Sequence, residues 1–120
     1  MKVLVCGSKD WTDAGAIERE FKKLPAGSTI VHGAGPGAEA IADKLAMKYG
    51  FSIKRYSVEE DDGKSSSSNR NSVMIRSEHV SGNPINLGLA FTSDLSRSRV
   101  AKDCVERAKK AGIKVNIISG

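Results

Sequence analysis

A glycine-rich turn between a predicted strand and a predicted helix constrains this chain more than any other feature. Residues 28–31 form a short β-branched apolar run typical of a buried strand. Apolar residues then recur at helical spacing from Ala38 to Tyr49. Between them lies Gly33-Ala34-Gly35-Pro36-Gly37, whose small residues allow close backbone approach. A turn that opens a helix gathers unpaired N–H groups and the positive end of the helix dipole, which favours an anion site. A plain connection between strand and helix has the same pattern.

The rest of the chain alternates predicted strands with predicted helices. The expected strands are Lys2–Gly7, Ser28–Val31, Phe51–Val58, Asn83–Phe91 and Lys114–Ser119. Four helices are expected. The first begins after a cap at Thr12 or Asp13, the second spans Ala38 to Tyr49, the third spans Asn69 to about Ser77, and the last begins at Val100 and ends at Gly112. This order predicts a single α/β domain over residues 1–120, a three-layer sandwich of about five parallel strands with helices on both faces.

Three loops leave the carboxyl ends of the predicted strands. They are residues 7–12, 33–37 and 92–98. Open parallel sheets bind ligands beyond the carboxyl ends of their strands, where the winding direction reverses. We therefore expect the binding site to lie among these three loops.

Composition narrows the class of protein and of partner. A chain of 120 residues has room for one core, and its net charge of +5 weakly favours an anionic partner. No apolar run approaches the roughly 20 residues that span a bilayer, and the N-terminus has no signal-peptide pattern. Cys6 and Cys104 are far apart in sequence and are expected in the core. We expect a cytoplasmic protein with no membrane partner and no metal site.

Residues 59–68 change abruptly to an acidic and serine-rich run, which predicts a polar, flexible loop. Gly63-Lys64-Ser65 within it resembles the end of a phosphate-binding P-loop. The glycine that this motif requires five residues earlier is Val58 here, so we reject that interpretation.

Several segments together resemble a known family. They are Gly7-Ser8-Lys9-Asp10-Trp11-Thr12-Asp13, Val31-His32-Gly33 with Gly37-Ala38-Glu39, Arg70-Asn71-Ser72-Val73-Met74, and Gly112-Ile113-Lys114-Val115. In this order they resemble the short YspA-type branch of the SLOG superfamily, which includes LOG-type cytokinin-activating phosphoribohydrolases and the DNA-processing protein DprA. The resemblance implies a Rossmann-like sheet, a nucleotide or nucleotide-derived ligand with its phosphate on the glycine turn, no further cofactor, and a homodimer or larger assembly.

Two departures from the family pattern bear on catalysis. Pro36 replaces an arginine that could hold a phosphate. LOG-type enzymes also carry Gly-Gly-x-Gly-Thr and then a glutamate at the helix after the fourth strand, where this chain has Ser96-Arg97-Ser98-Arg99. Cleavage of an N-glycosidic bond needs a carboxylate near the sugar. The weak catalytic candidates are Asp94, in the preceding loop, and Asp103, one position late.

The candidate ligand contacts come from all three loops and from the segment at Arg70. Backbone amides of Gly33, Gly35, Gly37 and Ala38 are expected to hold phosphate, and Ser8, after Gly7, to hold a phosphate or ribose oxygen. The remaining candidates are Trp11, His32, Arg70, Asn71, Ser96, Ser98 and Arg99.

Each of these side chains has an ordinary structural alternative. Trp11 can stack on a base or fill the edge of the core. His32 is more often a structural hydrogen-bonding residue than a catalyst. Arg70 matches a family arginine that faces the ligand, and its fork suits phosphate. Arg97 and Arg99 lie at a predicted helix N-terminus, which favours an anion between them or simple solvent exposure.

Three functions remain open at this point. The first is a non-catalytic binder that senses or sequesters an ADP-ribose-like or cyclic-nucleotide-like molecule. The second is a nucleoside 5′-monophosphate phosphoribohydrolase. The third is a DNA-binding module, which the scarcity of interleaved aromatic residues disfavours, so we do not expect a nucleic-acid partner.

Overall fold

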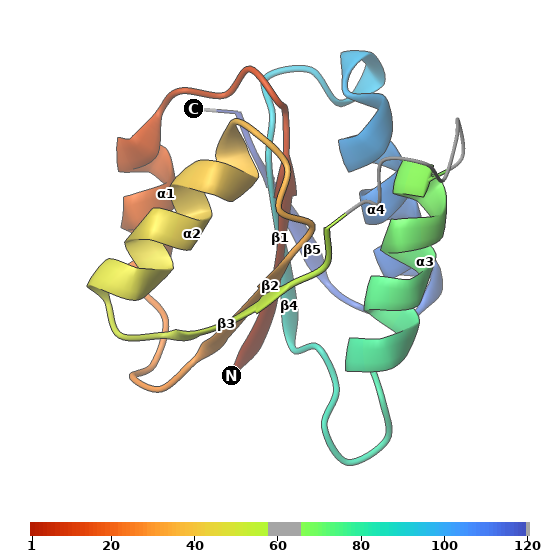
Figure 1. The fold of residues 1–120 in the computed structure, drawn as a ribbon, viewed down its shortest axis with the longest axis horizontal. Helices are drawn as coiled ribbons and strands as arrows, with labels where there is room; N and C mark the ends of the chain where they lie inside the picture. Colours follow the sequence, from red (N-terminus) through yellow and green to blue (C-terminus); the bar gives the residue numbers. More distant parts are fainter. Residues whose placement is uncertain (58–65, 120) are drawn as a thin grey trace.

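A computed structural model of the protein, which describes residues 1–57 and 66–119, has one parallel sheet with the strand order β3-β2-β1-β4-β5 (Figure 1). The strands are β1 (Lys2–Gly7), β2 (Thr29–His32), β3 (Ser52–Arg55), β4 (Leu87–Phe91) and β5 (Val115–Ile118). The helices are α1 (Ala14–Phe21), α2 (Ala38–Lys48), α3 (Ser66–Glu78) and α4 (Arg99–Lys110), with a 3-10 turn η1 (Leu95–Arg97) before α4. The predicted Rossmann-like α/β fold is confirmed.

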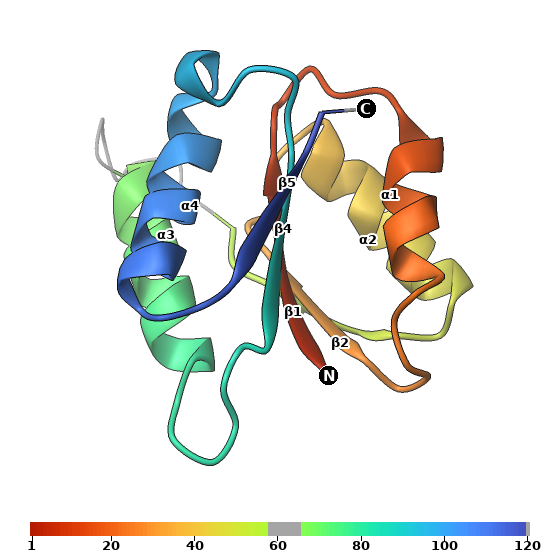
Figure 2. The ribbon, with the colours of Figure 1, turned by 180° about the vertical axis from the view of Figure 1, so that it is seen from behind.

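The helices cover both faces of the sheet, and Figure 2 shows α3 and α4 on the side opposite α1 and α2. Strand β1 therefore alternates between two cores. Val3 and Val5 pack with the α1 and α2 side, while Leu4 and Cys6 pack with the α3 and α4 side. A strand buried on both faces needs apolar residues at successive positions, which explains the uninterrupted run from Val3 to Cys6. In the described part of the chain, no helix is long and apolar enough to cross a membrane.

A buried ion pair fixes the end of α3 to the start of β1. Lys2 Nζ lies 3.2 Å from Glu78 Oε1, and both side chains are almost fully buried. Tyr56 Oη also donates to Glu78, and burial together with this carboxylate raises the pKa of Tyr56 to about 12. Burial by itself would raise the pKa of Glu78, but hydrogen bonds from Tyr56, Lys54 and Lys2 outweigh it and lower that pKa. This cluster sets where α3 lies against the sheet.

The order of the strands creates a crevice above β1 and β4. The chain moves outward from β1 through β2 to β3 and then returns to β4 and β5 on the other side. Its winding therefore reverses between β1 and β4, which pair in register from Val3↔Leu87 to Gly7↔Phe91. The connections after these two strands diverge, and this divergence leaves room for a ligand.

The start of α2 lies unusually close to the end of β1. The amide of Ala38 donates to the carbonyl of Ser8 at 3.1 Å. A Cβ on Gly7 would lie 2.5 Å from Ala38 Cβ, and a Cβ on Gly37 would lie 2.4 Å from the Ser8 carbonyl oxygen. Gly37 also has a φ of +73°, which favours glycine. The two glycines therefore bring α2 onto β1.

Several predicted boundaries differ from the observed ones, for local reasons. Strand β3 ends at Arg55 because its partner β2 ends at His32, the residue opposite. Strand β4 begins only at Leu87, because the amides of Asn83 and Ile85 donate to the Val80 carbonyl and to His79 Nδ1 and not to a neighbouring strand. Pro84, between them, has no N–H to donate. Helix α3 begins earlier than predicted, at Ser66, and Ser68 Oγ accepts from Arg107 Nη2 at 2.7 Å. The polar loop predicted for 59–68, with its Gly63-Lys64-Ser65 motif, lies outside the described residues up to position 65.

The close approach of α2 predicts a large cost for Gly37→Ala. The substitution combines a positive φ with overlap against backbone atoms, so we expect about 2 kcal/mol or more of lost stability. Gly50→Ala is the control for a positive φ by itself, because Gly50 has a φ of +72° and open space around it. Backbone strain alone predicts about 1 kcal/mol there. Urea denaturation measures both, and equal losses would contradict the role assigned to the close approach.

Candidate functional site

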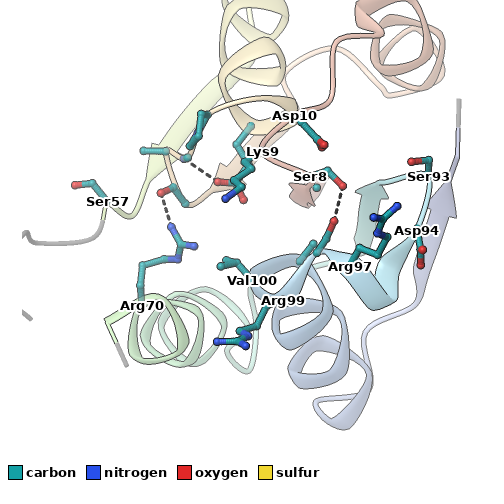
Figure 3. A pocket seen from close by; sticks show the side chains of 18 residues that line it. Ser8, Lys9, Asp10, Ser57, Arg70, Ser93, Asp94, Arg97, Arg99 and Val100 are labelled. Carbon is teal, nitrogen blue, oxygen red and sulfur yellow. Dashed lines mark hydrogen bonds between the residues drawn. The ribbon is translucent and has the colours of Figure 1, made fainter. Parts of the chain in front are cut away.

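A cavity of 750 Å³ lies over the carboxyl ends of β1, β2 and β4, between the starts of α2 and α4 (Figure 3). All three loops predicted to form the site contribute to its wall. It is lined by Gly7, Ser8, Lys9, Asp10, Gly33, Ala34, Gly35, Pro36, Glu39, Ser57, Arg70, Ser93, Asp94, Arg97, Ser98, Arg99, Val100 and Ala101.

At one end of the cavity, the first turn of α4 has no side-chain cap among the residues that the structure describes. Arg99, Val100 and Ala101 line the cavity there, and the N-cap residue Ser98 makes no side-chain bond to the helix amides. The hydroxyl of Ser98 instead lies 2.6 Å from Ser8 Oγ, which donates to Thr92 Oγ1 at 2.6 Å. These three hydroxyls tie the ends of β1 and β4 to α4. The first backbone N–H groups of the helix, which have no acceptor within the helix, are therefore available to a ligand in the cavity.

The amides of the glycine turn have acceptors inside the protein. Ala34 N–H donates to His32 Nδ1 at 2.9 Å, and Gly35 N–H donates to Glu39 Oε1 at 2.8 Å. The Ala38 amide bonds to Ser8, as described above. The turn lines the cavity, but these three N–H groups do not point freely into it. The phosphate contact predicted for the amides of Gly35 and Ala38 therefore has no basis in this geometry.

A chain of side chains holds the turn from behind. Because His32 Nδ1 accepts from Ala34, its proton is on Nε2, which lies 2.7 Å from Asp43 Oδ2. Arg55 Nε donates to the same Asp43 oxygen at 2.6 Å. Hydrogen bonds from Arg55 and then His32 lower the pKa of Asp43. His32 is thus a positioning residue for the turn and does not line the cavity.

Two buried charged residues flank the turn on its cavity side. Glu39, in the first turn of α2, is 5% exposed, and burial raises the pKa of its carboxyl group even though Arg70 and the Gly35 amide oppose this. Arg70 reaches across from α3, where its Nη1 donates to the carbonyls of Gly33 and Tyr56 and its Nε donates to Asn71 Oδ1 at 2.9 Å (Figure 3). The cavity therefore has a carboxylate and a guanidinium at this end.

Comparison with known proteins matches residues 1–61, just over half of the chain, to the model of the YspA, cpYpsA-related SLOG family. The chain belongs to this family. It is also 33% identical over 124 residues to the Gene 61 protein of Mycobacterium phage D29, in an alignment that covers 95% of this chain and 93% of that protein. The matched SLOG segment runs from β1 through β3, so it includes the glycine turn and Glu39 but neither Arg70 nor α4.

About half of the site residues predicted for this SLOG protein line the cavity. Gly7, Ser8, Gly33, Gly35, Arg70, Ser98 and Arg99 do so, as does the weak catalytic candidate Asp94. The carboxylate of Asp94 accepts from Ser96 N and Ser96 Oγ at the start of η1, so Asp94 and Ser96 largely satisfy each other.

The other predicted site residues are not among those that line the cavity, and each has a structural role. Trp11 packs on Phe91 at the core edge and donates to the carbonyl of Asp13. Asn71 donates to the Val100 carbonyl and to Asp103, which also pairs with Arg107. His32, Gly37 and Ala38 support the turn from behind, as described above.

The sequence-based list omitted several lining residues, of which Glu39 is the most informative. It was noted only as part of the family match, where an acidic residue follows the glycine turn. An acidic side chain in the first turn of a helix normally stabilises the helix dipole and stays exposed. Lys9, Asp10, Ser57 and Ser93 also line the cavity from loops, without any periodic signal. Arg97 lines it as well, from the 3-10 turn, as the expected anion between Arg97 and Arg99 requires.

The raised pKa of Glu39 predicts how stability depends on pH. A carboxyl group that is harder to ionise when folded favours folding fully below its unfolded pKa, near 4.5, and this contribution is lost as the pH rises through its folded pKa. Glu39→Gln has no such charge, so its stability relative to wild type should increase from pH 4.5 to pH 8. Thermal melts across this range measure the difference, with the exposed Glu106→Gln as control. A constant difference for Glu39→Gln would contradict the assignment.

Proposed function

We propose that this protein binds a nucleotide or nucleotide-derived phosphorylated small molecule in the cavity, with the phosphate at the start of α4. The observation that carries the proposal is the uncapped first turn of α4, which meets the cavity beside the hydroxyls of Ser8 and Ser98. Helix amides and the positive end of the dipole bind phosphate without a specialised sequence. Membership of the SLOG family supports a nucleotide-related ligand.

The charges around the α4 end also favour an anion. Arg97 and Arg99 line the cavity there, beside Asp94. Two cations and one carboxylate give this end a formal charge of +1. Arginines at the N-terminus of a helix are repelled by its dipole, and an anion between them removes that penalty.

The size of the cavity suits a nucleotide better than a free phosphate. Its 750 Å³ falls in the range of about 300–1,000 Å³ found for small-molecule sites. The cavity also extends from α4 past Ser8 to Arg70 and the glycine turn, so its wall offers polar groups well beyond a phosphate (Figure 3). The proposed role is to sense or sequester such a molecule.

Calorimetric titration with AMP, cyclic AMP, ADP-ribose and unphosphorylated adenosine tests this function. We expect at least one phosphorylated compound to bind and adenosine to bind much more weakly. Arg99→Gln should weaken binding about fivefold to tenfold, because it removes one partly exposed charge near the phosphate. Lys109→Gln, on an exposed position at the far end of the same helix, should have no effect. Equal binding of adenosine and AMP, or no binding of any compound to folded protein, would contradict the proposal.

One observation favours hydrolysis of the N-glycosidic bond as a second candidate function. Glu39 faces the cavity with a raised pKa, a property that suits a general acid. Glu39 replaces Asp94 and Asp103, the catalytic candidates from the sequence, since both of those carboxylates are engaged by neighbouring side chains. Release of adenine from AMP, detected by chromatography, tests it. Turnover should disappear in Glu39→Gln and survive in Asp103→Asn; the absence of any adenine release from wild type would remove this candidate.

A further inference from the structure

The end of the cavity opposite α4 is a second polar subsite, formed by Glu39, Arg70, Gly33 and Gly35, which we call the inner end. Glu39 Oε1 accepts from the Gly35 amide at 2.8 Å, and the Gly33 amide also faces this carboxyl group. Among the described residues, no group lies in hydrogen-bonding geometry with Oε2. Every fully buried side-chain nitrogen or oxygen among the described residues does have a partner. Oε2 is therefore not sealed in the protein but remains in contact with the cavity that Glu39 lines.

Arg70 is likewise hydrogen-bonded to the protein through only part of its polar group, but it donates hydrogen bonds and does not accept them. Its Nε and Nη1 are occupied by Asn71 and by the carbonyls of Gly33 and Tyr56. Within the described residues its Nη2 has no protein partner, and the residue lines the cavity while only 9% exposed. The inner end therefore presents one free carboxylate oxygen, which only accepts hydrogen bonds, and one free guanidinium nitrogen, which only donates.

The two glycines of the turn make room for this pair. A Cβ on Gly35 would lie 2.9 Å from Glu39 Oε1, and a Cβ on Gly33 would lie 1.9 Å from Arg70 Nη1. These glycines hold two protein side chains in place, where the family pattern had suggested a phosphate. The formal charges of Glu39 and Arg70 cancel, and the free oxygen of the Glu39 carboxylate only accepts hydrogen bonds, so this pair of side chains favours a neutral hydroxyl group over a second phosphate.

We infer that Glu39 selects a sugar with free hydroxyls, so that the site takes ribonucleoside 5′-phosphates and discriminates against dideoxy and 3′-phosphorylated analogues. This inference rests on the proposed function, which places the 5′-phosphate at α4. A hydroxyl of the ribose donates to Glu39 Oε2, and the oxygen of a neighbouring hydroxyl accepts from Arg70 Nη2. Burial has already removed most of the water that would solvate Glu39, and a ligand hydroxyl replaces it.

The test compares the affinities of three ligands for the wild-type chain by calorimetry. They are AMP, 2′,3′-dideoxyadenosine 5′-monophosphate, which lacks both hydroxyls, and adenosine 3′,5′-bisphosphate, which adds charge at the inner end. We expect AMP to bind about tenfold more tightly than the dideoxy compound, because a hydrogen bond to a buried charge is lost. The bisphosphate should bind more weakly than AMP, since it brings a second negative charge beside Glu39.

Glu39→Gln provides the second arm. Glutamine keeps the size and the carbonyl that accepts from Gly35, but its free end donates a hydrogen bond. The preference for AMP over the dideoxy compound should therefore shrink to about threefold, the part that the hydrogen bond from Arg70 supplies. Glu106→Gln, exposed on α4, should keep the full preference. Circular dichroism checks that each variant folds. If Glu39→Gln does not fold, the comparison of AMP with the dideoxy compound in the wild-type chain tests the inference by itself.

The outcomes separate this inference from the proposed function. Equal wild-type affinities for AMP and the dideoxy compound would overturn the role of Glu39 and leave the phosphate site at α4 standing. A preference that persists unchanged in folded Glu39→Gln would overturn it as well. Failure of all phosphorylated compounds to bind would overturn the proposed function, and the inference with it.

Discussion

The contact between the start of α2 and the end of β1 is the constraint on which the rest of the site depends. It requires the missing side chains of Gly7 and Gly37 and is closed by the bond from the Ala38 amide to the Ser8 carbonyl. Because α2 begins against β1, the preceding turn is directed over the sheet and Glu39 follows immediately within the first helical turn. The same contact fixes Ser8, whose hydroxyl joins those of Thr92 and Ser98 across the crevice. One backbone approach thus positions both ends of the cavity.

The glycine turn has a different role from the one its pattern predicts. Glycine turns before helices are associated with phosphate because their amides are free. In this chain a histidine ring nitrogen and a carboxylate already accept from two of those amides. The amides still face negative or electron-rich atoms, but the atoms belong to the protein. This is why the proposed phosphate site is at the first amides of α4, where Ser98 supplies no side-chain cap.

The fold could be predicted almost completely from the sequence, because periodic apolar residues and glycine stops report local structure directly. The cap at Asp13 and the helix end at Gly50 are examples. The site could be predicted less well. The location of the cavity followed from the expected order of the strands. The contacts of Trp11, Asn71 and Asp103 did not, because they depend on which residue the fold brings beside each side chain. The burial of Glu39 was equally hidden, since nothing in a linear sequence shows that Arg70 will cross from α3.

The family match ends before α3, and this division runs through the cavity itself. The segment that the family model matches supplies the glycine turn and Glu39, while the chain beyond it supplies Arg70 and the first turn of α4. The two ends of the cavity therefore belong to different stretches of the polypeptide. A substitution in the later stretch alone changes the wall at α4 and leaves the carboxylate of Glu39 in place.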